Sequence, residues 1–139
     1  MVVLAPGALY AGYEAALART RVAGRSAPPG AGDLASQCGR GMDALLAVCR
    51  PGNTGAELYR AWEGSGNSDS PVPLAHGLGL GAEPPVIGLG RGSDAVLEEG
   101  MVLSVQSWVA EEGVGGCLER AAVVIESGRA SALTRYGRL

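Results

Sequence analysis

Residues 100–126 read GMVLSVQSWVAEEGVGGCLERAAVVIE and contain the two most strand-like segments of the chain. Residues 101–109 are rich in valine, and residues 117–126 form a second apolar run, a composition that favours strands. The segment Glu111-Glu112-Gly113 between them has the polar residues and the glycine of a turn. The stretch therefore predicts two consecutive strands joined by a tight turn, and a short third strand is expected over residues 130–134.

Two helices are predicted upstream of these strands. Apolar side chains recur at helical spacing over residues 34–49, after Asp33, which can cap a helix, and before Pro51-Gly52, which ends it. A second helix is expected to begin after Asn53-Thr54, where threonine offers a cap, and to end at the glycines of residues 64–66. Both segments therefore read as amphipathic helices with one apolar face.

Further strands are predicted before the helices, over residues 1–4, 8–13 and 15–22, as a hairpin or a bulged pair. The segment from residue 73 to residue 92 is glycine-rich, and its glycines favour sharp turns and close approach of strands. The order of strands, two helices and strands indicates an α+β fold. We expect a curved antiparallel sheet with the helices packed on one face.

Length and composition limit the classes of function. The chain has 139 residues and a formal net charge of −3, which suits a single domain over residues 1–139 and leaves no basic stripe for nucleic acid. Its three cysteines, Cys38, Cys49 and Cys117, form no CxxC pair and are expected to be small buried thiols. No apolar run is long enough to cross a membrane, and no basic region precedes the first apolar stretch. We therefore expect a cytoplasmic protein without a membrane partner.

Four short motifs carry the functional signal. They are GYEAALART at residues 12–20, AHGLGL at 75–80, GMVLSVQS at 100–107 and GGCLE at 115–119. The second motif contains His76, the only histidine of the chain. Each motif is weak alone, but their order and spacing together are specific.

In this order the motifs resemble those of the metallopeptidase family M24, the pita-bread superfamily of methionine aminopeptidase, aminopeptidase P, prolidase and creatinase. The resemblance implies the C-terminal half of that fold, with two metal ions held by two Asp, one His and two Glu. His76 and Glu119 match the histidine and one glutamate of this set. The two aspartate positions fall on Ala5 and Ala16, and the other glutamate position falls on Gln106. Because alanine has no donor atom and glutamine has no charge, we expect a degenerate site without a metal or another cofactor.

Three functional interpretations follow from the resemblance. The first is a non-catalytic binding module or subunit that takes a peptide or a small molecule in the vestigial pocket. The second is a metal-independent, creatinase-like hydrolase of a small C–N compound, with His76 and Glu119 as catalytic residues and with Gln106, Glu83 and Trp108 binding the substrate. The third is a truncated remnant of a metallopeptidase that lacks the N-terminal half of the family's fold.

Each of these side chains also has a plainer explanation. His76 lies beside glycine-rich loops and can be a structural hydrogen-bonding residue, and Glu119 can form a local charge pair with Arg120. Glu83 precedes two prolines and can be a solvated carboxylate, while Trp108 on a strand can serve packing alone. Half of a larger fold would also leave a sheet edge and an apolar face exposed, which favours a homo-oligomer or a partner chain.

Overall fold

The computed structural model of the protein describes residues 1–24, 26–68, 70–89 and 93–134. Its centre is a five-stranded antiparallel sheet in the order β6-β5-β7-β8-β9. The strands are β5 Ala75–Leu78, β6 Ala82–Ile87, β7 Val102–Glu111, β8 Gly115–Glu126 and β9 Arg129–Ala132. Strands β7 and β8 pair without a register shift, so the two strands and the turn predicted from residues 100–126 are confirmed.

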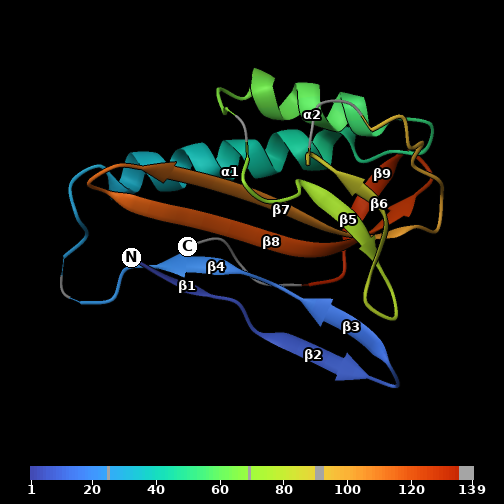
Figure 1. Ribbon diagram of the computed structural model, residues 1–139, viewed down its shortest axis with the longest axis horizontal. Coiled ribbons are helices and arrows are strands. Elements are labelled where there is room, and N and C mark those ends of the chain that lie inside the picture. Colours follow the sequence, from blue (N-terminus) through green and yellow to red (C-terminus); the bar gives the residue numbers. More distant parts are fainter. Residues whose placement is uncertain (25, 69, 90–92, 135–139) are drawn as a thin grey trace.

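Both helices pack on the same face of this sheet, as Figure 1 shows. Helix α1 is Ala31–Val48 and α2 is Gly55–Gly64. The buried apolar side chains of α1 recur at the predicted helical spacing, and burying each leucine or methionine among them contributes roughly 1.5–3 kcal/mol. They are Leu34, Cys38, Met42 and Leu45. The expected α+β fold with helices on one face of an antiparallel sheet is therefore confirmed.

The start of α2 is stabilised by a capping interaction. The Glu57 carboxylate accepts hydrogen bonds from the backbone N–H of Thr54 at 2.6 Å and from its hydroxyl at 2.9 Å. These two bonds favour the ionised form and hold the pKa of Glu57 below its usual range. Thr54 therefore caps the helix, which begins at Gly55, as its position in the sequence predicts.

An N-terminal arm, residues 2–21, carries four short strands. They are β1 Val2–Leu4, β2 Gly7–Tyr10, β3 Tyr13–Ala16 and β4 Arg19–Arg21. Strand β1 pairs with β4 and β2 pairs with β3, so the predicted hairpin forms with an interruption on each side. Ala18 and Arg120 exchange backbone hydrogen bonds of 3.2 and 3.0 Å, which join the arm to β8. Figure 1 shows the arm on the side of β8 away from the helices.

The hairpin of β5 and β6 lies in the glycine-rich segment. Gly77 sits where β5 and β6 are so close that an added Cβ would overlap the Pro84 carbonyl oxygen. The glycines thus permit close approach of strands, as expected. They also remove the alternation of side chains by which a strand is identified from sequence, so the sequence of this segment does not predict where its strands begin and end.

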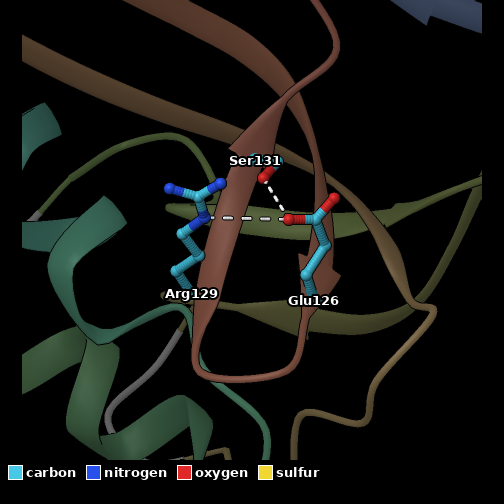
Figure 2. A network of polar contacts seen from close by, with 3 residues as sticks. All are labelled: Glu126, Arg129 and Ser131. Atoms are coloured by element: carbon cyan, nitrogen blue, oxygen red, sulfur yellow. Dashed lines mark hydrogen bonds and ion pairs between the residues drawn. The ribbon is translucent and has the colours of Figure 1, made fainter.

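The turn between β8 and β9 carries a small polar network, shown in Figure 2. The Glu126 carboxylate accepts a hydrogen bond from the Ser131 hydroxyl and lies 3.7 Å from Nε of Arg129. The two charged side chains are 49% and 79% exposed, and surface ion pairs of this kind contribute little to stability. This network is therefore a feature of the turn.

Within the described ranges, no helix has both the length and the apolar character needed to span a bilayer.

Candidate functional site

His76 lies on strand β5, between β6 and β7 in the sheet, and is half-buried opposite Ser104 of β7. Its Nδ1 is 2.9 Å from the carbonyl oxygen of Gly77. A carbonyl oxygen only accepts hydrogen bonds, so this contact places the proton of a neutral ring on Nδ1 and leaves Nε2 as an acceptor. The ring is thus held in the tautomer in which Nε2 can accept a proton or a hydrogen bond from a ligand.

Gln106 lies on β7 on the same face as His76, because residues 104 and 106 are two apart on one strand. The residue is 3% exposed, and both ends of its carboxamide form hydrogen bonds. Its Nε2 donates to the Pro73 carbonyl at 2.6 Å, and its Oε1 accepts from Nε of Arg120 at 2.7 Å. Gln106 therefore ties β7 to the residues before β5 and to β8.

Arg120 is the side chain that sequence reasoning did not assign to this site. The β7–β8 register places Arg120 directly opposite Gln106, so its guanidinium lies on the face that carries His76. The sequence does contain a signal for this register. If Glu111 pairs with Gly115 at the turn, counting residues outward along both strands places Arg120 opposite Gln106. The face that the family resemblance assigns to metal ligands thus carries a cation.

Glu119 lies on the opposite face of the sheet. Its ladder partner is Ser107, whose hydroxyl donates at 2.7 Å to the carbonyl oxygen of Cys38 in α1. Since partners in a ladder point to the same side, Glu119 faces the helix layer while His76 faces away from it. The structure therefore does not bring together the two residues predicted to be a catalytic pair.

A cleft of about 630 Å³ lies where Glu119 points. Strand β4, helix α1 and strand β8 form its walls. Its charged side chains are Arg19, Arg21, Arg40, Asp43 and Glu119. The cleft thus combines three cations with two anions, and of the five predicted site residues it includes only Glu119.

Cys117 forms part of the wall of this cleft, and the thiol of Cys38 lies against it from the helix side. A hydrogen bond from Cys38 stabilises the thiolate of Cys117 and lowers its pKa to about 7. The same contact, followed by burial, raises the pKa of Cys38. Burial alone raises the pKa of Cys49 to about 12. The predicted burial of all three cysteines is confirmed, but only Cys117 lines the cleft.

Glu83 and Trp108 lie in separate surroundings. Glu83 is exposed on β6, and its Oε1 accepts a hydrogen bond of 3.0 Å from the backbone of Leu80. Trp108 lies opposite Leu118 and lines a second cavity of about 220 Å³ together with Trp62. The substrate-binding roles given to both residues stay predictions.

The metal-ligand positions on the N-terminal arm carry no donor atoms. Leu17 donates its backbone N–H to the Pro6 carbonyl at 3.2 Å, so Ala5 and Ala16 lie on paired segments of the arm. Among the described residues, no three His, Cys, Asp or Glu side chains are grouped so that they could hold a metal ion. Together with Arg120 on the face of His76, this donor set does not fit a pair of divalent ions.

The fold nevertheless has close structural relatives. The prolidase from Pyrococcus furiosus superposes with a TM-score of 0.83 at 27% identity, covering 98% of this chain and 41% of that one. The dipeptidase PepE from Mycobacterium ulcerans superposes with a TM-score of 0.86 at 25% identity, covering 97% of this chain and 38% of that one. The N-terminal domain of the FACT complex subunit SPT16 from Cicer arietinum has the same fold, with a TM-score of 0.82 at 21% identity and coverage of 98% and 35%. The chain therefore spans about two fifths of the length of the two peptidases.

No curated protein matches the sequence. The sequence profile of metallopeptidase family M24 matches residues 1–127, which is most of the chain. This match agrees with the pita-bread fold of the prolidase and dipeptidase structures and with the motifs around His76, Gln106 and Glu119. The chain therefore belongs to metallopeptidase family M24.

Proposed function

We propose that this chain is a metal-free member of family M24 that binds a peptide or a small molecule, as a binding module or as a subunit of a larger assembly. The hydrogen bond between Arg120 and Gln106 carries the proposal. It sets a cation and a neutral amide on the face where the family resemblance calls for carboxylates.

Electrostatics supports the absence of a metal pair. Two divalent ions in one site require several carboxylates to balance their charge, and Ala5 and Ala16 supply none. Two unit charges about 4 Å apart near a protein surface interact by about 4 kcal/mol. A divalent ion near Arg120 meets twice that repulsion, while Gln106 offers it no charge. The face is thus adapted to an anionic or neutral group instead of a cation.

The names of the relatives indicate a class of ligand. A prolidase and a dipeptidase act on short peptides, and these structures share at least a quarter of their aligned residues with this chain. The free carboxylate of a short peptide suits Arg120, because guanidinium groups bind carboxylates strongly. The N–H groups of the same peptide suit the Nε2 acceptor of His76. We therefore favour a short peptide over other ligands.

Exposed apolar side chains on the N-terminal arm favour a subunit role. Leu9, Tyr10 and Tyr13 are 71%, 85% and 63% exposed on the β2–β3 hairpin. Tyr10 and Tyr13 are ladder partners on one face of the hairpin, and exposed apolar side chains grouped in this way favour an interface with a second copy or a partner chain. The free thiols fit a cytoplasmic location, since disulfides are rare there.

The test is binding and turnover of Xaa-Pro dipeptides in the presence of a chelator. Calorimetry should show saturable binding to the wild-type chain that Arg120→Met and His76→Ala both weaken, with no hydrolysis product by chromatography. Glu112→Gln is the matched control, because Glu112 is exposed in the turn between β7 and β8 and has no predicted role in binding. Chelator-resistant hydrolysis lost in His76→Ala would favour the creatinase-like alternative, and the absence of any binding would contradict the proposal.

A further inference from the structure

Two of the three cysteines meet between α1 and β8. The Cys38 thiol lies 3.3 Å from the carbonyl oxygen of Ser107 and 3.5 Å from that of Cys117. The Cys38 thiol is therefore packed directly against the backbone of Cys117. These residues are 79 positions apart in the chain, so the fold alone creates this contact.

The two sulfur atoms differ in access. Cys117 lines the cleft between β4 and α1, and the residue is 5% exposed. Cys38 is fully buried and lies behind Cys117 on the helix side. Cys49, also fully buried, directly follows the C-terminal end of α1 and lines no described cavity. A small reagent in the cleft therefore reaches Cys117 first, and Cys38 is the thiol in contact with it.

We propose that Cys117 and Cys38 form an oxidant-sensitive thiol pair that hydrogen peroxide converts into an intramolecular disulfide. In the first step the Cys117 sulfur attacks one peroxide oxygen, the O–O bond breaks, and water leaves with the thiol proton. Cys117 is then a sulfenic acid, oxidised by two electrons, and the peroxide is reduced. In the second step the Cys38 sulfur attacks the Cys117 sulfur. The S–S bond forms, the S–O bond breaks, and a second water leaves with the Cys38 proton.

The contact between the thiols favours this second step over further oxidation. A sulfenic acid without a neighbouring thiol persists or proceeds to the sulfinic acid, whereas an adjacent thiol condenses with it. The resulting bond ties α1 to β8 at the wall of the cleft that Arg21 and Arg40 also line. Oxidation would thus change the surface that a ligand in this cleft meets.

The experiment is peroxide treatment of the full chain at neutral pH, followed by peptide mapping without reduction. We expect a single intramolecular 38–117 cross-link that dithiothreitol reverses, with Cys49 still alkylated in full after unfolding. In Cys38→Ala the reaction should stop at Cys117 sulfenic acid, trapped by dimedone. Cys49→Ala is the matched control, because it also removes a buried thiol from the region of α1 and should leave the cross-link unchanged.

Several results would overturn the proposal. One is oxidation of Cys49 as fast as that of Cys117, which would mean that the cleft gives no selective access. Another is a cross-link between two chains instead of within one. A third is accumulation of Cys117 sulfinic acid in the wild type without a disulfide. Circular dichroism of each variant separates loss of the pair from loss of the fold.

Discussion

Replacing Gly41 by alanine tests how closely α1 packs on the sheet and on α2. An added Cβ would lie 2.5 Å from a ring carbon of Trp62, and 2.7 and 2.9 Å from polar atoms of Asn67 and Ser107. Trp62 is 1% exposed and donates its Nε1–H to the Ser68 carbonyl at 2.7 Å, so a shift of its ring would disturb this hydrogen bond. The alanine methyl group therefore has to displace α1 or its neighbours.

Gly39, two residues before Gly41, is the matched control. It lies in the same helix, and an added Cβ there meets nothing within 4 Å. Alanine in place of glycine inside a helix stabilises by about 1 kcal/mol. Both variants gain this contribution, so the difference between them measures the packing cost alone.

The expected magnitudes follow from these contacts. Overpacking a filled core costs about 1–3 kcal/mol, and three overlapping atoms favour the upper part of that range. Gly39→Ala should raise the free energy of unfolding by about 0.5–1 kcal/mol. Gly41→Ala should lower it by about 1–2 kcal/mol, as measured by urea unfolding with unchanged slope. Equal stability of the two variants would refute the packing described for α1.

Three further predictions concern polar groups. Arg120→Met leaves Oε1 of the buried Gln106 carboxamide without its donor, and urea unfolding should show a loss of about 1–3 kcal/mol; an unchanged midpoint would contradict this contact. The pKa of Glu57 is lowered by its bonds from Thr54, so its carboxylate stabilises the fold above the unfolded value of about 4.3. This stabilisation is lost as pH falls through the lower folded pKa, and Glu57→Gln should flatten that acid limb of stability against pH, whereas an unchanged acid limb would argue against the cap. The peroxide-treated chain should have a higher urea midpoint than the reduced chain, and its free energy of unfolding should rise by up to roughly 4 kcal/mol for a loop of this length. A lower midpoint would mean that the cross-link strains the fold.

The strands β7 and β8 and both helices could be predicted because local chemistry decides them. Valine-rich runs, a polar turn and an apolar face at helical spacing leave few alternatives. The hairpin of β5 and β6 could not be delimited, because its glycines carry no side chains to alternate. Gly41 weakens the helical pattern in sequence, and the positions of Trp62, Asn67 and Ser107 in the fold explain why a glycine occupies that place.

Motif order led to the family, which the profile match shows, and to the positions His76, Gln106 and Glu119, whose roles stay predictions. The arrangement of these side chains could not be predicted in the same way. The face on which each side chain lies depends on the strand register, where a shift of one residue reverses the result. That register sets Arg120 opposite Gln106 and turns Glu119 toward α1, which no single motif indicates.

The proposed absence of a metal pair can be tested directly on protein purified without a chelator. Elemental mass spectrometry gives its metal content, and calorimetric titration with Mn²⁺ gives its affinity, with a metal-loaded prolidase as the positive control. We predict substoichiometric metal and no saturable Mn²⁺ binding, in the wild-type chain and in Gln106→Glu alike, because the alanines and Arg120 remain. One or two tightly bound equivalents in the wild-type chain would contradict the account and would show that other residues complete the site.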